Sequence, residues 1–467
     1  MSSPFNEKKY KKLLEGLEIT MKNKSEVFDM FFNERMDAEF FSKKYLKFEK
    51  TILSKTYKRL SEVAFVTDGE HGNAVTFPHG YSKYYGARNA TSMILNDNGV
   101  EYITQEHHKK LIKTELKPRD VLISCVGANI GCSAIVPDNV GIANIVRNVA
   151  LIRSINQNVL NEYLHVFFNT KYGKNLYVRM SSGNAQPLVS LDYINTIPVF
   201  IPSIRFQLKI KDKTDVALNN LSQSEFLYRQ AENLLLKTIG LSDFKPSTRG
   251  TNIKSFKESF LATGRLDAEY YQPKYEDYLR LVKNYVDGFD LLQTACNLKD
   301  ENFTPKETKE YQYIELSDIG KTGNITGCTF AEGSELPTRA RRKVSTNDVI
   351  ISSIEGSLGS CALVTKDYDN AICSTGFYVI NSQKINSETL LVLFKSEVMQ
   401  NILKQGCSGT ILTAINKTEF QNIPIPLINV KIQQQIADLI QESFTLRRES
   451  EQLLEEAKSL VEREIEE

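Results

Sequence analysis

The sequence predicts a mixed α/β (α+β) protein made of two similar units. Two long helices that form an intramolecular coiled coil are expected to join them, with pseudo-two-fold symmetry. Three observations lead to this prediction. Short segments recur at a nearly constant offset, β-rich and helical stretches follow the same order twice, and a heptad-like pattern closes each copy.

The repeat covers most of the 467 residues. Three segments occur twice: RMDAEFF at 35–41 and RLDAEYY at 265–271, DVLIS at 120–124 and DVIIS at 348–352, and Ile-Pro at 197–198 and 423–424. Their offsets of 230, 228 and 226 residues indicate two copies of one structural unit. A two-copy chain suits a partner with approximate two-fold symmetry, of which duplex DNA is the commonest.

Each copy changes character along its length. In the first, residues 6–50 are typical of helices, and residues 60–203 contain short β-rich runs between Gly, Asn and Asp turns, with a helical stretch near 158–176. In the second, residues 265–285 are helical and residues 310–427 are β-rich. This order predicts one α/β unit in each copy.

A long helix is expected at the end of each copy, over about 205–239 and about 430–467. The first carries a stripe of Ala217, Leu221, Ser224, Tyr228, Ala231 and Leu235, and the second has Leu439, Leu446, Leu453 and Leu460 every seven residues. A surface helix packed on its own domain is the alternative. Because both copies end in such a helix, we expect a helix pair with Leu221, Tyr228, Leu235, Leu439, Leu446, Leu453 and Leu460 in its interface.

The reach of such helices is compatible with DNA. A helix of about 30 residues spans about 45 Å, more than the roughly 34 Å of one turn of B-DNA. Two units held apart by such rods could therefore reach two half-sites about one turn apart.

Composition bounds the class of protein. Hydrophobic residues make up 41% and charged residues 25% of a chain with formal net charge +1, as in ordinary globular proteins. No apolar run is long enough for a membrane span, and the N-terminus lacks an apolar signal core. Seven scattered cysteines without a Cys-x-x-Cys pair favour a reducing cytoplasm. The net charge is no argument for nucleic-acid binding, but the loops are locally basic while residues 447–467 are rich in Glu.

No catalytic or metal-binding constellation is expected. The chain has no Asn-Pro-Pro-Tyr-like or Asp-Pro-Pro-Tyr-like tetrapeptide, and Gly320-Lys321-Thr322 has Glu315 where a P-loop needs its first glycine. The adjacent His107 and His108 make a poor metal chelate because their side chains diverge. The carboxylate pairs Asp37/Glu39 and Asp267/Glu269 are interpreted as capping groups or ion-pair partners of Arg35 and Arg265.

Basic loops occur at matching places in both copies. Lys109, Lys110, Lys113, Lys117 and Arg119 precede the 120–124 strand, and Arg339, Arg341, Arg342 and Lys343 lie in the matching region of the second copy. Residues 72–89 mix glycines with His79, Tyr81, Lys83, Tyr84, Tyr85 and Arg88. Such loops suit phosphate contacts, although solvated surface charges remain the alternative.

Base reading needs planar hydrogen-bonding groups. Arginine suits guanine, and Asn or Gln suits adenine. The candidates are Arg88, Asn89, Arg147, Asn184 and Gln186 in the first copy, with Asn324, Thr326 and Thr410 as weaker candidates in the second.

These features together resemble the specificity subunit of type I restriction–modification systems over nearly the whole chain. The segments that carry the resemblance are TDGEHG at 67–72, which includes His71, LKPRDVLISCVG at 116–127, SGNAQPL at 182–188, YIELSDI at 313–319, RARR at 339–342 and STGF at 374–377. Three positions depart from the family pattern. Arg119 replaces a usual glycine, Glu70 a usual threonine, and Arg147 stands where glutamine is often found.

The resemblance implies two target recognition domains that each read one half of a split, asymmetric DNA site. It implies domain boundaries at 1–203 for the leading helical segment and first recognition domain, 204–250 for the central helix and connector, 251–427 for the second recognition domain and 428–467 for the C-terminal helix. The two long helices would pack antiparallel as a coiled coil and set the spacing of the half-sites. Methyltransferase subunits, two of them, would dock on these helices and methylate adenine, and a motor–nuclease subunit would join them. S-adenosylmethionine, ATP and Mg²⁺ would then bind to these partners and none to this chain, which would catalyse nothing.

Two alternatives remain. The chain could be the recognition subunit of a related phage-defence or fused methyltransferase system. It could also be a repeat-built protein scaffold that does not touch DNA.

Overall fold

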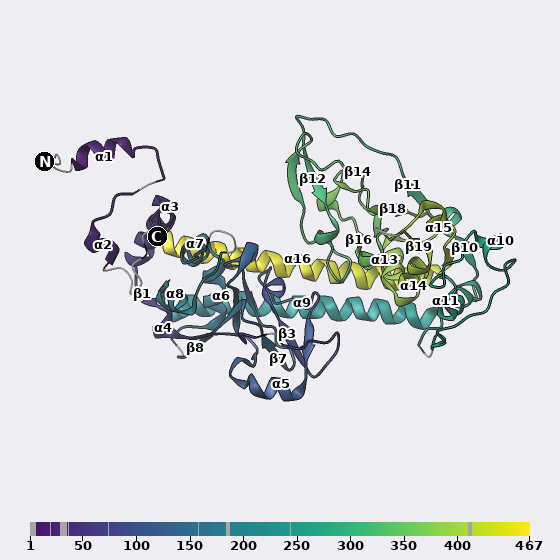
Figure 1. Cartoon of the computed structure of the whole chain (residues 1–467), viewed down its shortest axis with the longest axis horizontal. Helices are drawn as coiled ribbons and strands as arrows, with labels where there is room; N and C mark the ends of the chain where they lie inside the picture. Colours follow the sequence, from purple (N-terminus) through teal and green to yellow (C-terminus); the bar gives the residue numbers. More distant parts are fainter. Residues whose placement is uncertain are drawn as a thin grey trace. The chain divides into compact units, whose positions relative to one another are not determined.

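The computed structural model divides the chain into two compact units (Figure 1). Unit 1 comprises Met1–Asn220 and Glu449–Glu467, and unit 2 comprises Leu221–Arg448. The residues that the structure describes are 6–18, 20–28, 35, 37–72, 74–156, 158–183, 187–242, 244–409 and 413–467.

The described residues of unit 1 form three small sheets. The largest has the order β2-β8-β5-β6 and is antiparallel throughout; the second has the order β4-β3-β7, with β3 antiparallel to β4 and parallel to β7; β1 pairs with β9. The strands are β1 (Tyr57–Arg59), β2 (Ala64–Asp68), β3 (Ser82–Tyr85), β4 (Glu101–Ile103), β5 (Val121–Ser124), β6 (Ser133–Ile135), β7 (Ala143–Ile145), β8 (Val149–Ser154) and β9 (Pro198–Phe200).

Helices surround these sheets. The helix expected near 158–176 is two helices, because Thr170 ends α6 and its hydroxyl then accepts a hydrogen bond from Gly173 N, 3.1 Å away, to cap α7. The helices of this part are α1 (Glu7–Leu13), α2 (Lys24–Phe28), α3 (Lys43–Leu53), α4 (Leu60–Val63), α5 (Gln105–Lys110), α6 (Asn161–Asn169), α7 (Lys171–Arg179) and α8 (Leu191–Thr196), with short 3₁₀ turns η1 (Ala87–Asn89), η2 (Ile112–Thr114) and η3 (Gly127–Asn129).

Unit 2 repeats this plan. Its largest sheet has the order β11-β18-β15-β16, its second the order β13-β12-β17-β14, and β10 pairs with β21. The strands are β10 (Phe289–Leu291), β11 (Asn297–Lys299), β12 (Glu310–Ile314), β13 (Thr329–Glu332), β14 (Ala340–Lys343), β15 (Val349–Ser352), β16 (Cys361–Leu363), β17 (Ile372–Ser374), β18 (Phe377–Asn381), β19 (Cys407–Ser408), β20 (Ala414–Ile415) and β21 (Pro424–Pro426). The predicted mixed fold with an internal repeat is confirmed.

The helices of unit 2 occur in the same order as those of unit 1. They are α10 (Phe260–Thr263), α11 (Pro273–Lys283), α12 (Leu292–Ala295), α13 (Ser387–Lys395), α14 (Glu397–Gly406) and α15 (Lys417–Gln421), with 3₁₀ turns η4 (Leu316–Asp318), η5 (Glu355–Ser357) and η6 (Lys366–Tyr368). One difference matters for the surface. Unit 2 has strand β14 at the place where the repeat offset puts the turn η2 in unit 1, so the second basic segment is held in a sheet.

The repeated Arg-x-Asp-Ala-Glu segment forms a turn before α3 and before α11, rather than a helix. Arg265 Nη2 lies 2.7 Å from Asp267 Oδ2 and donates to the carbonyl oxygen of Cys407 at 2.8 Å. The Asp267 carboxylate in turn accepts the Tyr270 N–H, as expected for a cap. The Arg265 hydrogen bond outweighs partial burial and holds the pKa of Asp267 below its usual value.

The first copy has the same contacts. Arg35 Nε lies 2.7 Å from Asp37 Oδ2, and its guanidinium donates to the carbonyl oxygens of Met180 and Ser181 just after α7. Asp37 accepts the Phe40 N–H at 3.0 Å. The expected capping and ion pairing are therefore confirmed for Asp37 and Asp267, whereas Glu269 instead accepts the Tyr275 hydroxyl at 2.6 Å. The arginine contacts tie the turn to the end of α7 or α14.

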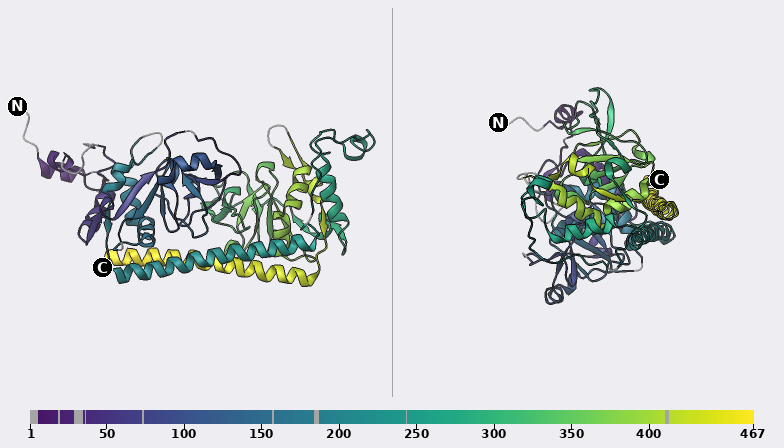
Figure 2. Two further views of the ribbon diagram at one scale, coloured as in Figure 1. Left: turned by 90° about the horizontal axis from the view of Figure 1, so that it is seen from below. Right: turned by 90° about the vertical axis from the view of Figure 1, so that its right-hand side faces the viewer.

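The long helices are α9 (Ile204–Thr238) and α16 (Val430–Glu466), and each contributes a segment to each unit. In unit 1, Ser450 Oγ donates to the carbonyl oxygen of Ala217 at 2.7 Å; in unit 2, Ser443 Oγ donates to that of Ser224 at 2.8 Å. Lys213 of α9 also pairs with Glu456 at 2.7 Å. The residue numbers on α16 therefore decrease as those on α9 increase, as in an antiparallel pair. Within each unit the two segments are antiparallel and lie side by side (Figure 2).

The seam of α16 lies beside the predicted leucine stripe. Leu439, Leu446, Leu453 and Leu460 are only half-buried. The buried line consists of Ile436, Ile440, Ser443, Ser450, Leu454, Ala457 and Val461. The stripe was misplaced because Ser and Ala occupy the tightest positions, where the seryl hydroxyls are satisfied by backbone carbonyls. On α9, Tyr228 and Leu235 are buried as expected, and Leu221 is half-buried.

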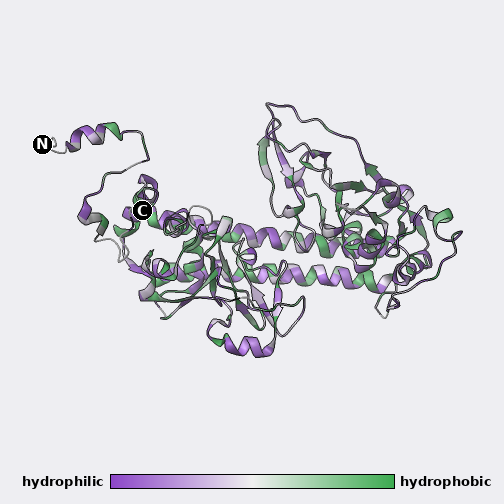
Figure 3. Ribbon diagram, in the orientation of Figure 1, coloured by the Kyte–Doolittle hydropathy of each residue, from purple (hydrophilic) through white to green (hydrophobic). Residues whose placement is uncertain are grey.

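Hydrophilic and hydrophobic residues alternate along both long helices (Figure 3), and the residues that are exposed on them are mostly hydrophilic. The central strands β5 and β15 are buried over their whole length. Ile210, Ala457, Val461 and Ile465 from the long helices join the main core of unit 1. In unit 2 the corresponding core takes residues from α9 such as Tyr228 and Leu235, and from α16 such as Ile436.

The seam register predicts unequal effects at neighbouring leucines. Leu454→Ala should lower the free energy of unfolding by about 2–4 kcal/mol, because Leu454 is 3% exposed and its truncation leaves a cavity. Leu453→Ala, at the half-buried neighbouring position, should cost less than about 1.5 kcal/mol. Urea denaturation followed by circular dichroism measures both, and equal losses would place the seam elsewhere.

The turn of the second copy predicts an acid-sensitive contribution to stability. The pKa of Asp267 is lower in the folded chain, so its contribution is complete above the ordinary value of 3.8 and disappears as pH falls through the folded-state pKa. We expect Asp267→Asn to cost at most about 1 kcal/mol near neutral pH, allowing for solvent screening of a 46% exposed carboxylate. The difference in melting temperature from the parent should shrink below about pH 4. A difference that stays constant down to about pH 3 would contradict the ionic role.

Candidate nucleic-acid interface

Four loops of unit 1 meet at the carboxyl end of β7. Glu70, after β2, forms a bridge with Val146, and its carboxylate lies 2.7 Å from His107 Nε2 on α5. Asn148 Oδ1 accepts the N–H of Ala87, after β3, at 3.1 Å. The segments after β2, β3, β4 and β7 therefore form one continuous surface.

Gly69 permits the closest of these approaches. A Cβ atom at this position would lie 2.0 Å from the carbonyl oxygen of Ile145, so a side chain would force the loop after β2 away from β7. Steric exclusion therefore explains why glycine follows Asp68 in the 67–72 segment. The Tyr84 hydroxyl adds a contact, donating to Glu70 at 3.3 Å from β3.

Arginine and histidine side chains reach solvent on this surface. Arg147 is exposed and forms no hydrogen bond or ion pair with the residues that the structure describes. Arg88 is 56% exposed and lies 3.0 Å from Glu101. His71 is 68% exposed beside Asp68, 2.7 Å away. Of the predicted base-reading side chains Arg88, Asn89 and Arg147, which lie within the described ranges, Arg147 is consequently the most available.

Lysines extend the same surface along α5 and η2. Thr104 caps α5, whose last turn carries exposed Lys109 and Lys110; Lys110 pairs loosely with Glu106 at 3.6 Å. Lys113 is exposed in η2, with its ammonium 5.7 Å from the Phe65 ring centroid. Figure 3 shows α5 as a strongly hydrophilic helix. These lysines can approach a phosphate backbone without breaking a strong internal pair.

An aromatic side chain lies next to the lysines. Tyr81 is 43% exposed and its ring packs edge-on against His108, with the ring centroids 5.7 Å apart. His108 is buried and fixed by Asn144, 2.6 Å away. The Tyr81 ring is therefore held in place while its outer edge faces solvent.

Unit 2 carries an equivalent basic surface on β14. Arg339 is 60% exposed, lies 3.1 Å from Glu315, and accepts the Thr375 N–H at 2.8 Å through its carbonyl oxygen. Thr375 occupies the repeat position of Arg147. Arg341 is exposed and Lys343 lies 5.9 Å above the Phe303 ring. The two copies thus place cations at matching sites from different residues.

Several predicted residues support their own loops. Asn89 is fully buried and its amide donates to the carbonyl oxygens of Asn96 and Asn98 at 3.0 and 2.9 Å. Asn324 is also buried and accepts the Thr322 hydroxyl at 2.9 Å. The expectation that these amides present themselves to bases is corrected, because each satisfies polar groups of its own turn.

Three other side chains are engaged but nearer the surface. Lys83 lies 2.9 Å from Asp97, and Arg342, only 15% exposed, lies 2.9 Å from Asp300. Thr326 is exposed, with its hydroxyl donating to a backbone carbonyl oxygen at 2.9 Å. Alternation along β14 explains why Arg342 turns inward while its neighbours Arg341 and Lys343 are exposed. Asn184, Gln186 and Thr410 lie outside the described residues, and their assignment stays a prediction.

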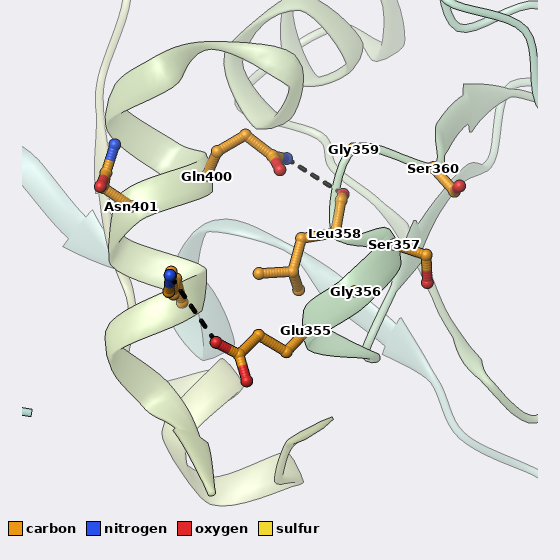
Figure 4. A pocket seen from close by; sticks show the side chains of 9 residues that line it. Glu355, Gly356, Ser357, Leu358, Gly359, Ser360, Gln400 and Asn401 are labelled. Atoms are coloured by element: carbon orange, nitrogen blue, oxygen red, sulfur yellow. Dashed lines mark hydrogen bonds and ion pairs between the residues drawn. The ribbon is translucent and has the colours of Figure 1, made fainter. Parts of the chain in front are cut away.

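A hollow of about 510 Å³ lies between η5 and α14 (Figure 4), and no residue that lines it was among the predicted site residues. Lys404 lies 3.8 Å from Glu355 across it, and Gln400 Nε2 donates to the carbonyl oxygen of Leu358 at 3.0 Å. The other lining residues are Gly356, Ser357, Gly359, Ser360 and Asn401. The recurrence of this loop as residues 127–132 was the available signal, but a glycine-containing turn alone does not reveal a hollow.

The described ranges contain few groups that could bind a metal ion or transfer a proton. Those ranges hold no group of three or more His, Cys, Asp and Glu side chains that could bind a metal ion. Burial lowers the pKa of His165 to about 3, so this imidazole is neutral and sits in the core beside Ser133. Throughout the same ranges, every helix is too short or too polar to cross a membrane.

Comparison with solved structures finds low sequence identity over nearly full length. The S subunit of a type I restriction–modification system from M. genitalium matches 87% of this chain and 92% of its own, with 12% identity and a TM-score of 0.37. The HsdS subunit from Thermoanaerobacter tengcongensis matches 87% and 95%, with 14% identity and a TM-score of 0.27. A structure from a study of type I R-M system assembly and conformational transition matches 88% and 97%, with 15% identity and a TM-score of 0.29.

Among curated proteins there is no match to the chain. A family model, by contrast, matches residues 289–458, which include β10, the sheets of unit 2 and most of α16. Its description is the type I restriction modification DNA specificity domain. Over residues 289–458 the chain is therefore similar to the type I restriction modification DNA specificity domain.

Proposed function

We propose that the chain is the DNA sequence-recognition subunit of a type I restriction–modification complex. The observation that carries the proposal is the duplication. The second copy matches a DNA specificity domain, and the first copy builds a main sheet with the same strand order. Each copy then reads one half of a bipartite DNA site.

The loops of the two copies support an asymmetric site. Arg147 in unit 1 is replaced by Thr375 in unit 2, and Lys109 and Lys110 of α5 by Pro337 and Thr338. Arginine can pair with guanine through two hydrogen bonds, which threonine cannot do. Two units with the same strand order but different loop residues would read two half-sites of different sequence.

Exposed cations in both copies supply the affinity. Lys109, Lys110 and Lys113 in unit 1, and Arg341 and Lys343 in unit 2, can neutralise phosphates. Arg88, Arg147 and Arg339 have exposed guanidinium groups suited to base edges or phosphates.

The long helices give the chain its partner surface. We infer that their hydrophilic faces dock two methyltransferase subunits, which bind S-adenosylmethionine and methylate adenine, and that a motor–nuclease subunit using ATP and Mg²⁺ joins them. This chain then acts in the cytoplasm without catalysing a step or holding a cofactor. A related phage-defence or fused methyltransferase system with the same recognition domains is the second candidate, and a scaffold that does not bind DNA the third.

Salt dependence tests the basic surface. The double variant Arg341→Ala/Lys343→Ala should bind duplex DNA more weakly, and the slope of log K against log salt should fall by about two, one unit for each lost phosphate contact. Mobility-shift titrations of the chain with its methyltransferase partner measure this slope. Lys257→Ala/Lys283→Ala, at two exposed lysines outside the basic surface and the long helices, is the matched control and should keep the parent slope.

Arg342→Ala separates binding from folding. It removes the ion pair with Asp300, so it should lower thermal stability with little change in the slope. A parent protein that shifts no duplex at any salt concentration, with or without the methyltransferase, would leave only the scaffold candidate.

Methylome sequencing of cells that express the full system tests the bipartite reading. We expect adenine methylation in a split motif with two unequal halves. Arg147→Ala should relax one half alone, at a cost of about 1–3 kcal/mol for the base that loses its partner. A continuous motif, or relaxation of both halves together, would contradict one domain per half-site.

A further inference from the structure

Arg119 has surroundings unlike those of the other basic residues. Its side chain is only 20% exposed, and its guanidinium lies among three carboxylates. Nη2 is 3.0 Å from Asp138 and 3.0 Å from Asp215, and Nε is 4.0 Å from Glu162. The sequence pattern predicts that this arginine binds DNA, whereas these carboxylates already occupy its guanidinium.

Lys211 completes the cluster. It forms ion pairs with Asp215, one turn later on α9, and with Glu162 at 3.7 Å. Its hydrogen bond to Asp215 raises the pKa of Lys211, so the ammonium stays charged at neutral pH. Two cations therefore face three carboxylates. A phosphate approaching Arg119 meets a group with net negative charge, which disfavours DNA at this place.

The five residues come from separate elements of unit 1. Arg119 lies in the turn that enters β5, Asp138 follows β6, and Glu162 begins α6. Lys211 and Asp215 lie in the first turns of α9, within the segment that belongs to unit 1. The cluster thus fastens the largest sheet of unit 1 to its own portion of the long helix.

The backbone at Arg119 favours a different residue. Its φ of 69° is in the left-handed region, which side chains other than glycine rarely adopt. A non-glycine residue persists in such a conformation when surrounding contacts hold it there. The guanidinium contacts to Asp138 and Asp215 are the contacts that glycine could not provide.

The second copy solves the same junction without this charge cluster. Asn347 occupies the repeat position of Arg119 and has φ 70°, and Ala437 replaces Lys211. Gln441, at the position of Asp215, donates to Glu388 at 2.7 Å. An amide–carboxylate hydrogen bond here takes the place of a five-residue ionic group.

We propose that Arg119 is a positioning residue, which holds the main sheet of unit 1 against its segment of α9 and does not contact DNA. Its consequence for half-site reading rests on the proposed function, whereas its structural role does not. The loops that carry Arg147 and Lys109 are connected to strands of this sheet. Weakening the contact between the sheet and α9 should therefore make the position of the unit 1 surface less defined and leave that of unit 2 unchanged.

Hydrogen–deuterium exchange on the full chain tests the positioning role. Arg119→Gly fits the backbone and removes the guanidinium. Exchange should become about tenfold faster in residues 115–124 and 204–220, which corresponds to a lost charge-assisted contact. Asp215→Asn should accelerate the same segments. Asn347→Gly is the matched control and should leave the exchange of both segments at the parent rate. Unchanged exchange in Arg119→Gly and Asp215→Asn would overturn the proposal.

A salt titration with sheared duplex DNA of mixed sequence separates positioning from phosphate contact. Arg119→Gly should keep the parent slope of log K against log salt; a slope reduced by about one would identify Arg119 as a phosphate ligand and overturn the proposal. Should the parent protein fail to bind DNA, the proposed function would fail, while the exchange measurement would still decide the role of Arg119.

Discussion

Each compact unit depends on contacts with helical segments that are remote in the sequence. The main core of unit 1 is completed by Ala457, Val461 and Ile465, which lie at the far end of the chain from the strands they cover. Ser450 and Ser443 let the helices approach closely, because each hydroxyl is satisfied by a backbone carbonyl oxygen of α9. Bulkier side chains at these seam positions would push the helices apart and withdraw apolar residues from the units.

Much of the frame could be predicted from the sequence. The offsets of the repeated segments predicted two units, and the ends of the β-rich stretches predicted where α9 and α16 begin. The positions of α16 that face α9 were harder to predict from the sequence. Hydropathy predicts that Leu446 and Leu453 are buried in the seam. The closely packed positions are instead occupied by serine and alanine, and whether these residues fit there depends on the side chains of the opposite helix.

The candidate surface was harder to predict than the frame. Arg341 and Arg342 are adjacent and chemically identical, yet one is exposed and the other pairs with Asp300. Composition cannot distinguish them; only membership in strand β14 assigns them to opposite faces. Asn89 similarly has the right chemistry for adenine, but its partners lie within the 86–98 loop and are invisible to a motif.

The two copies conserve the means of attachment and vary the chemistry that is attached. Asp120 and Asp348 cap equivalent turns through the N–H groups of Lys117 and Ser345, at 2.7 and 2.8 Å. Immediately before each, a left-handed residue turns the chain, and there the copies differ, with Arg119 in one and Asn347 in the other. The junction of sheet and helix can thus be held by an ionic cluster or by a hydrogen bond from an uncharged amide to a carboxylate. Because ionic contacts weaken with salt while amide hydrogen bonds respond little, two units with one fold need not respond alike to their surroundings.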